Sequence, residues 1–405
     1  MTSTMERHTG HWPDVETVPR ARLRASIARA LFRRVARRLP INAVYGDAPA
    51  QGPALRVHRP EAFFRRVGAG GLIGFGESYM AGDWDAEDLP GVLTVMAAEL
   101  ATLVPAPLQR LRALAVRRAP RRDRGTVEGA RRNIHRHYDL SNELFAEFLD
   151  ETMTYSAALF TDPATATWDS LAAAQRRKID RLLYQLMVGP GTRLLEIGTG
   201  WGELAIRAAR RGARVVSITL SKEQQELARE RAAAAGLADR IDIRLCDYRE
   251  IDGSYDAIAS VEMIEAVGAD YWPTYFRTLD ERLAPGGRVA LQAITMPHDR
   301  MRATLGTHTW VQKYIFPGGM LPSVPAIQQH LGPLRIIDRL SMREHYAATL
   351  RLWRERYQER APAVAALGFD EIFHRMWTLY LAYSEAGFRS GYLDVWQLTL
   401  DRSGA

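Results

Sequence analysis

The feature that most constrains the fold is a regular alternation of short apolar segments with amphipathic segments, which begins near residue 193. Apolar runs bounded by turn residues predict buried strands, and segments of helical periodicity between them predict helices. Strands are expected at 193–197, 214–219, 241–246, 255–261 and 288–294, and helices at 203–211 and 222–235. This alternation over short connections predicts a doubly wound parallel α/β sheet, in which ligands bind just beyond the carboxyl ends of the strands.

A glycine-rich turn, Glu196-Ile-Gly198-Thr-Gly200-Trp-Gly202, follows the first of these strands. Small residues at this place let the backbone approach a nucleotide-like cofactor closely. A dinucleotide fingerprint would need glycine where the chain has Glu203, whose charge opposes a pyrophosphate, and there is no phosphate-binding loop for ATP. A cationic cofactor facing Glu196 and Glu203 therefore fits better than NAD or ATP.

Composition restricts the class of protein. With 405 residues, 47% of them hydrophobic and 25% charged, the chain is typical of a folded protein of two domains. The single cysteine, Cys246, excludes an intramolecular disulfide and a multi-cysteine metal site and fits a reducing compartment. No apolar segment is long enough to span a bilayer and the N-terminus is unlike a signal peptide, so we expect a cytoplasmic location and no metal.

The net charge of +7 is concentrated in part near the N-terminus. Residues 17–40 contain eight arginines and no acid, while Leu23, Ile27, Leu31, Val35 and Leu39 recur every fourth residue. This pattern predicts an amphipathic basic helix. Such a helix could lie on an anionic membrane surface, or its apolar stripe could pack on its own domain while the arginines face water.

A second basic stretch, residues 110–136, is typical of a solvated linker. It predicts a division into a basic N-terminal domain, 1–124, and a second domain, 125–405. Within the first domain, residues 45–104 are expected to form short β pieces and turns, the latter at 68–71 and 75–79, followed by a helix. Neither basic stretch has interleaved aromatic residues, so nucleic acid is not an expected partner.

The glycine-rich turn resembles motif I of class I S-adenosylmethionine (SAM)-dependent methyltransferases. Cys246-Asp247-Tyr248 matches the segment of those enzymes that meets adenine, where the acid accepts from the exocyclic amine. A longer series of motifs resembles the family of cyclopropane-fatty-acyl-phospholipid and mycolic acid synthases over roughly residues 130–400. These motifs are Asn133-x-x-x-His137-Tyr-Asp-Leu-Ser-Asn142, Thr154-Tyr155-Ser156, Thr219-Leu220-Ser221-x-x-Gln224-Gln225, Asp247-Tyr248-Arg249, Lys313-Tyr314-Ile315-Phe316-Pro317 and Leu321-Pro322-Ser323.

The resemblance implies a class I SAM methyltransferase with a Rossmann-like doubly wound sheet and a smaller basic N-terminal accessory domain, as in the phospholipid-acting members. By the same resemblance, SAM would be held by Tyr155, Ser156, Gly198, Thr199, Gly200, Gly202, Thr219, Leu220, Gln224, Asp247 and Tyr248. The lipid would meet His137, Tyr314 and Phe316.

The implied reaction transfers the methyl group of SAM to a carbon–carbon double bond of the lipid, and it needs a base. An isolated alkene is a poor nucleophile, so the enzyme must position it against the methyl group and exclude water. The carbocation that forms must then lose a proton. In the family a bicarbonate ion is that base, held by cysteine, glutamate, histidine and tyrosine side chains and a backbone group. Glu265 and Tyr346 match two of these ligands, whereas Ala157 and Gln292 replace the cysteine and the histidine.

Glu262 is a further difference, because it stands where the family usually has glycine. With Glu265 it would lie on one face if the segment is helical, and paired carboxylates can raise one another's pKa and serve as a base. The alternative is a solvated carboxylate at a strand end. We therefore expect Glu265, Tyr346, Gln292 and Glu262 to be the catalytic residues, with bicarbonate as a possible second cofactor.

The segments 198–205 and 292–301 most resemble the actinobacterial branch that makes 10-methylene or 10-methyl fatty acids from oleoyl phospholipid, the tuberculostearic acid route. This implies a phospholipid membrane surface as partner, association with its inner face, and a separate reductase for the methylene product. A homo-oligomer is also expected. The alternatives are a cyclopropane synthase, a catalytically silent lipid-binding or partner protein, and a small-molecule or RNA methyltransferase.

Overall fold

The computed structural model describes residues 12–45, 54–99 and 141–402. The chain divides into two compact units, each described here by itself. Unit 1 comprises Met1–Arg117, His308–Ile315 and Leu350–Tyr392, and unit 2 comprises Arg118–Thr307, Phe316–Thr349 and Leu393–Ala405. A single boundary at residue 124 does not reproduce this division, because two later segments join the N-terminal unit. The whole predicted linker, residues 110–136, lies outside the described residues.

A seven-stranded sheet forms the centre of unit 2. Its first five strands, β4 (Arg193–Ile197), β5 (Arg214–Thr219), β6 (Ile241–Leu245), β7 (Tyr255–Val261) and β8 (Leu283–Thr295), confirm the five that the sequence predicts. Helices α11 (Glu203–Arg210) and α12 (Lys222–Ala234) are also where the periodicity places them. The fold class is therefore the predicted α/β class.

The strand order is β6-β5-β4-β7-β8-β10-β9, so the order reverses between β4 and β7. The pairs from β6 to β8 are parallel, whereas β10 (Asp394–Arg402) runs antiparallel to both of its neighbours, β8 and β9 (Leu334–Ser341). The prediction of a wholly parallel sheet is therefore wrong at the edge formed by β10 and β9. The apolar pattern of a strand sets which faces are buried but not the direction in which the chain enters the sheet.

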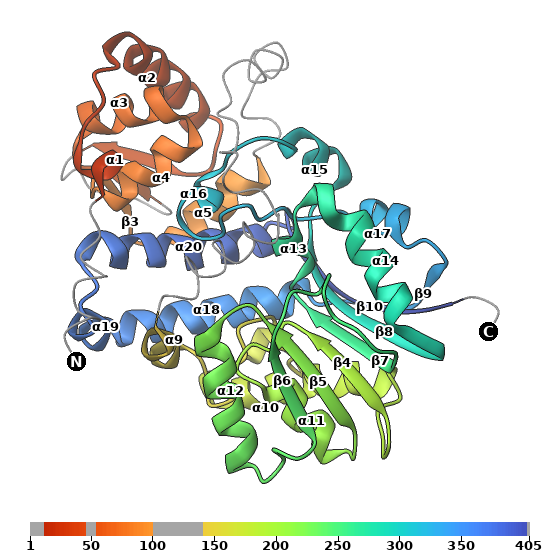
Figure 1. Ribbon diagram of the computed structural model, residues 1–405. Coiled ribbons are helices and arrows are strands. Elements are labelled where there is room, and N and C mark those ends of the chain that lie inside the picture. Colours follow the sequence, from red (N-terminus) through yellow and green to blue (C-terminus); the bar gives the residue numbers. More distant parts are fainter. Residues whose placement is uncertain (1–11, 46–53, 100–140, 403–405) are drawn as a thin grey trace. The chain divides into compact units, whose positions relative to one another are not determined.

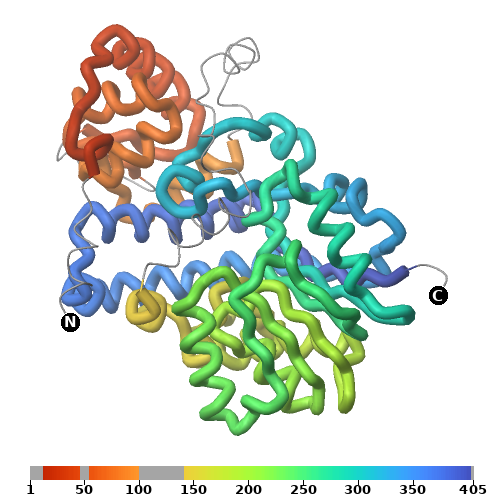
Figure 2. The backbone as a smooth tube through the Cα atoms, viewed as in Figure 1, coloured from red at the N-terminus to blue at the C-terminus, as the bar shows by residue number. Residues whose placement is uncertain are grey.

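Helices cover both faces of this sheet (Figure 1 and Figure 2). Successive residues of β4 point to opposite sides: Leu194 packs with α10 (Trp168–Gln185), α11 and α12, and Leu195 packs with α14 (Trp272–Arg282) and α17 (Val324–His330). The remaining elements are α9 (Asn142–Phe148), η3 (Pro163–Thr165), α13 (Ile264–Val267), η4 (Ala269–Tyr271), α15 (His298–Thr304) and α18 (Arg343–Glu359), which continues into unit 1.

Unit 1 contains a three-stranded sheet of order β1-β2-β3, with β1 parallel and β3 antiparallel to β2. Its strands are β1 (Asn42–Tyr45), β2 (Ala54–Val57) and β3 (Trp84–Ala86). Its helices are α1 (Pro13–Glu16), α2 (Arg22–Ala36), α3 (Pro60–Gly70), α4 (Leu72–Met80), α5 (Leu89–Ala98), α16 (Trp310–Tyr314), α19 (Ala361–Ala366) and α20 (Glu371–Arg389). No helix among the residues described has the length and apolar composition needed to cross a bilayer.

The expected turns at 68–71 and 75–79 are wrong, because these residues lie mostly in α3 and α4. Their glycines serve close packing: a Cβ added to Gly74 would lie 1.9 Å from the carbonyl oxygen of Arg66. Only Gly71, with φ of 59°, separates the two helices. Glycine occurs in turns and also where two backbones approach closely, and the local sequence does not distinguish these two uses.

Polar contacts explain why the later segments belong to unit 1. Arg375 of α20 donates to the carbonyl oxygens of Tyr79 and Trp84 and pairs with Asp85. The Trp310 side chain of α16 packs closely on Gly76 of α4: a Cβ added to Gly76 would lie only 2.4 Å from it. These long-range contacts have no counterpart in the local sequence pattern.

The basic helix α2 is present and exposes part of its apolar stripe. Leu23, Ile27 and Leu31 are 79%, 56% and 41% exposed, whereas Ala28 is buried and Phe32 packs edge-on against two phenylalanine rings of α3. The alternative in which the whole stripe packs on its own domain is therefore wrong for these three residues.

Candidate active site

A pocket lies at the carboxyl ends of β4, β5 and β7, where the strand order reverses. Open α/β sheets bind ligands at this point, because the connections on either side diverge there. Among the residues that line it are Tyr155, Ser156, Gly198, Thr199, Gly200, Thr219, Leu220, Gln224 and Tyr248, all of which the sequence places at a cofactor. Gly202 and Asp247 are not among the lining residues.

The glycine-rich turn forms an open cradle. Gly200 has φ of 52°, and a Cβ added there would have no atom within 4 Å. The same wall holds the buried carboxyl of Glu196, to which the Ser217 hydroxyl donates at 2.5 Å. Burial raises the pKa of Glu196 to about 8, opposed by the Ser217 hydrogen bond and the charge of Lys178. A cation in the pocket would favour its ionised form, so the wall suits a cationic nucleotide-like cofactor.

Other residues of the pocket carry groups that suit the rest of such a cofactor. The Tyr248 hydroxyl is buried without a hydrogen-bond partner among the described residues, and Cys246 also lines the pocket. Burial raises the pKa of Tyr248 to about 12, so its hydroxyl stays protonated and can donate. Thr219 donates to the Gln224 side chain at 2.9 Å and so orients it at the start of α12.

The Asp247 carboxylate is directed elsewhere. It accepts from the backbone N–H of Arg249 at 3.0 Å and from the Arg249 guanidinium at 2.7 Å. A buried carboxylate bound in this way is satisfied within its own turn. Its predicted contact with the cofactor therefore stays a prediction that the pocket does not support.

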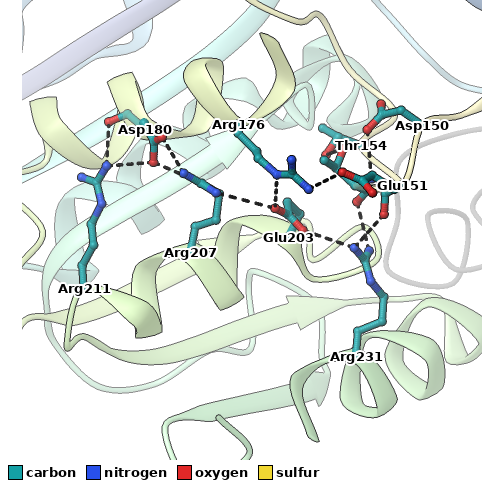
Figure 3. Close-up of polar contacts among 10 residues, drawn as sticks. Asp150, Glu151, Thr154, Arg176, Asp180, Glu203, Arg207, Arg211 and Arg231 are labelled. Atoms are coloured by element: carbon teal, nitrogen blue, oxygen red, sulfur yellow. Dashed lines mark hydrogen bonds and ion pairs between the residues drawn. The ribbon is translucent and has the colours of Figure 1, made fainter. Parts of the chain in front are cut away.

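Glu203 also differs from the expectation, since its charge is met by arginines. Figure 3 shows Glu203 between Arg176, Arg207 and Arg231, at 3.9, 4.0 and 3.2 Å. Although Glu203 touches the pocket, these cations neutralise it, so it is not a specific counter-charge for a cofactor. Arg207 in turn pairs with Asp180 at 2.5 Å.

Arg231 ties together the two chain segments that form one side of the pocket. Its guanidinium donates to the carbonyl oxygens of Thr152 at 3.0 Å and of Trp201 at 2.8 Å. It also donates to the carbonyl oxygen of Glu151 (Figure 3). The Arg231 guanidinium thereby holds together two parts of the chain, the segment that leads to Tyr155 and the glycine-rich turn. Sequence analysis missed this residue because, apart from Glu203, the partners named here are backbone atoms.

Lys178 is the other residue that sequence reasoning missed. It lines the pocket from α10, is 1% exposed, and donates to the Ser156 hydroxyl at 2.6 Å. Burial lowers its pKa to about 8, opposed by the charges of Glu262, Asp150 and Glu196. The available signal was a lysine at helical spacing from Leu171, Ala174 and Leu182, on what is the buried face of α10.

The structure brings together three of the four expected catalytic residues around the carboxylate of Glu262. Its Oε1 accepts from the Ala157 backbone N–H at 3.0 Å and from Gln292 Nε2 at 2.7 Å, and its Oε2 accepts from the Tyr346 hydroxyl at 2.8 Å. Protein groups supply these three hydrogen bonds, so the alternative of a solvated carboxylate at a strand end is wrong. Burial raises the pKa of Glu262, and these donors and Lys178 oppose that shift.

The Gln292 amide has only one orientation in this network. Arg181, which can only donate, bonds to Gln397 Oε1 at 2.9 Å, so Gln397 Nε2 donates to Gln292 Oε1 at 3.0 Å. The Nε2 of Gln292 must then face Glu262. A chain of long-range contacts thus determines which end of the amide meets the carboxylate.

Glu265, the fourth expected catalytic residue, lies on α13, whereas Glu262 precedes that helix with φ of 51°. The two carboxylates therefore do not share a helical face. Glu265 accepts from the Ile294 backbone N–H through Oε1, and its Oε2 has no partner among the described residues. Burial, followed by the charge of Glu262, raises the pKa of Glu265 to about 8, so the carboxyl is mostly protonated at neutral pH.

The two described members of the expected lipid-contacting set fall in different units. Tyr314 belongs to unit 1, where its hydroxyl donates to the Glu77 carboxylate at 2.9 Å. Phe316 belongs to unit 2 and is half-buried. His137 lies outside the described residues.

Comparison with known proteins agrees with this geometry. The family model described as mycolic acid cyclopropane synthetase matches residues 126–398. The chain belongs to this family. Its fold is that of class I SAM-dependent methyltransferases, which confirms the resemblance inferred from the motifs.

Two relatives in the cyclopropane synthetase family match nearly the whole chain. The chain is 59% identical over 409 residues to tuberculostearic acid methyltransferase UfaA1 of Mycobacterium tuberculosis, covering 97% of this chain and 96% of that protein. It is 35% identical over 366 residues to cyclopropane-fatty-acyl-phospholipid synthase of Escherichia coli, covering 89% and 90%. The solved mycolic acid cyclopropane synthase CmaA1, complexed with SAH and CTAB, is similar with a TM-score of 0.61 at 32% identity, covering 67% of this chain and 97% of that one.

Proposed function

We propose that the chain transfers a methyl group from SAM to the cis double bond of an oleoyl phospholipid and forms a 10-methylene fatty acyl product. The observation that carries this proposal is the pocket at the strand switch point, which combines the cofactor residues with the carboxylate of Glu262. The tuberculostearic acid methyltransferase at 59% identity supports the product class. The CmaA1 complex with SAH, the product of SAM after methyl transfer, supports the cofactor.

SAM, when bound, supplies an electrophilic methyl group. The chain's own task is to hold the alkene against that group and keep water away, because an alkene reacts poorly as a nucleophile. The wall near Glu196 would hold the cationic end of the cofactor, and Tyr248 its nucleoside end. The Glu262 side of the pocket would face the cation that forms on the acyl chain.

That cation has two outcomes. Loss of a proton from the new methyl group with ring closure gives a cyclopropane, whereas a hydride shift to the neighbouring carbon followed by loss from the methyl group gives an exomethylene. The E. coli relative supports the cyclopropane as the alternative product. The rebuilt acceptor site, with Ala157, Gln292 and Glu262 where the family has other residues, favours the exomethylene.

Isotope labelling distinguishes these products. We expect the purified protein, given oleoyl phospholipid vesicles and SAM with a deuterated methyl group, to form a lipid whose NMR spectrum shows vinylic methylene positions that retain two deuterons. Ring positions with two deuterons would establish the cyclopropane synthase instead. A protein that binds SAM but leaves no label in any lipid would be the catalytically silent lipid-binding or partner protein.

Reduction of a methylene product to a methyl branch requires a hydride donor. The glycine-rich turn has Glu203 where a dinucleotide site needs glycine, and that residue is committed to the arginines of Figure 3. We therefore propose a separate reductase as the partner that consumes the product. Self-association as a homo-oligomer remains part of the proposal and is measured by light scattering.

We further propose that unit 1 attaches the protein peripherally to an anionic membrane through α2. The exposed side chains of Leu23, Ile27 and Leu31 could enter the headgroup boundary while the arginines of the same helix face lipid phosphates. Each arginine near an anionic surface contributes about 1 kcal/mol. This arrangement would bring the enzyme to acyl chains that do not leave the bilayer.

The triple substitution Leu23→Ser, Ile27→Ser and Leu31→Ser should weaken binding to phosphatidylglycerol vesicles about tenfold or more, because each apolar side chain contributes roughly 1.5 kcal/mol when fully buried. Vesicle sedimentation measures the effect. Leu72→Ser, at a position on α4 that is 56% exposed like Ile27, is the control. Unchanged sedimentation of the triple variant would contradict the proposal.

A further inference from the structure

We infer that the Glu262 carboxylate is the general base of this reaction, a proton acceptor supplied by the chain itself rather than by a bound anion. This inference rests on the proposed methyl transfer. Three donors from separate parts of unit 2, the Ala157 N–H, the Gln292 amide and the Tyr346 hydroxyl, converge on this one carboxylate at the pocket wall.

The donors leave room for a proton. A carboxylate has about four lone-pair positions, and Oε1 of Glu262 accepts two hydrogen bonds while Oε2 accepts one. The remaining position on Oε2 is available to the reacting group. The three hydrogen bonds also hold the side chain in one orientation, which a base must have at the moment of transfer.

The backbone at Glu262 is in a conformation that favours glycine. Its φ of 51° is one of three positive values among the non-glycine residues described, and two of those residues, Met153 and Glu262, line the pocket. A side chain in this region costs roughly 1–2 kcal/mol. Strain of this kind persists where the surroundings over-determine it, and it concentrates at functional sites.

The charges around Glu262 suit a base. Burial raises its pKa, which strengthens it as an acceptor, while Lys178 and the three donors keep the ionised form accessible. Glu265 is close enough for the charge of Glu262 to raise its pKa after burial, so ionisation of one of the two carboxyls disfavours ionisation of the other.

The proton transfer balances without another reactant. The cation on the acyl chain loses a proton from the new methyl carbon: the C–H bond breaks, and its electron pair becomes the π bond of the methylene group. The proton bonds to Oε2 of Glu262, whose charge changes from −1 to 0. Release of this proton to solvent when the product leaves restores the carboxylate.

Two substitutions at this position test the inference. Glu262→Gln keeps the size of the side chain but removes the base, and should lower labelled-lipid formation about 10²–10⁴-fold while leaving the Kd for SAM within about threefold. Glu262→Gly suits the backbone conformation and leaves the three donors facing a space of carboxylate size. Sodium formate or bicarbonate should therefore restore activity to the glycine variant but not to the glutamine variant, whose side chain fills that space.

A second readout needs no lipid substrate. Formate should raise the Tm of the glycine variant in a concentration-dependent manner relative to sodium chloride at equal ionic strength, and should leave the wild type and Glu262→Gln unchanged. The wild-type rate should be the same in buffer depleted of bicarbonate.

The inference is overturned if Glu262→Gln keeps more than about a tenth of wild-type turnover, against the loss expected for a general base. It is also overturned if the wild type requires added bicarbonate, or if the folded glycine variant responds to formate in neither assay. A wild type that labels no lipid overturns the proposed function instead. The formate shift of Tm then still decides whether the three donors form an anion site.

Discussion

Replacement of Lys178 by methionine is expected to lower the free energy of unfolding by about 3–5 kcal/mol, because it leaves buried carboxyl groups without their cation. Methionine has a similar length and fills the space, so the loss reports the charge rather than a cavity. Lys178 is 1% exposed and donates to Ser156. It is close enough to Glu262 and Glu196 for their charges to oppose the lowering of its pKa by burial. Urea denaturation measures the change.

The same substitution should shift the pH dependence of turnover. Lys178 opposes the rise in the pKa of Glu262 that burial causes, so without it the carboxyl holds its proton to higher pH. Turnover at neutral pH should fall and recover in part as the pH is raised, because the ionised base then returns. The groups that face Glu262 besides Lys178 are the Ala157 N–H, Gln292, Tyr346 and Glu265.

Lys222→Met is the matched control for Lys178. Lys222 lies on α12 with its side chain 68% exposed, 3.5 Å from Glu226, and exposed pairs of this kind contribute about 0–1 kcal/mol. Equal stability losses in the two variants, or an unshifted pH profile in Lys178→Met, would show that Lys178 does not act on the buried carboxyl groups.

Replacement of Arg231 by methionine is expected to weaken SAM binding about tenfold or more. Its guanidinium bonds to the carbonyl oxygens of Thr152 and Trp201, so it holds the segment before Tyr155 against the glycine-rich turn. It also pairs with Glu203 (Figure 3). Loss of one charge-assisted hydrogen bond costs about 1.5–3 kcal/mol. If 1.4 kcal/mol of that must be recovered when the cofactor orders the segment, the Kd rises about tenfold.

Calorimetry measures the Kd, and hydrogen exchange of residues 150–158 reports the order of the segment. Exchange there should accelerate in Arg231→Met and slow again when SAM is added. Arg210→Met, at an exposed position of α11, is the matched control and should change neither quantity. A Kd for Arg231→Met within twofold of the wild type would mean that the segment is ordered without this arginine.

Several features of this protein are determined by the sequence itself. The bounds of β4, β5 and β7 agree with the prediction, because apolar runs flanked by glycine and charged residues define strands locally. The cofactor turn was predictable for the same reason, since its glycines are contiguous with the first strand. The family motifs identified the class of chemistry, and nine of the eleven cofactor residues that they predicted line the pocket.

Other features were decided only by the tertiary structure. The partners of Glu262, namely Ala157, Gln292 and Tyr346, lie 105, 30 and 84 positions away in sequence. The sequence showed that Glu262 was unusual, but not that three donors would meet it. Likewise it did not show that Glu203 would be neutralised by arginines, or that residues 308–315 and 350–392 would join the N-terminal unit. Periodicity reports which side of an element is buried, whereas a buried polar site depends on which elements meet there, and that is decided by long-range packing.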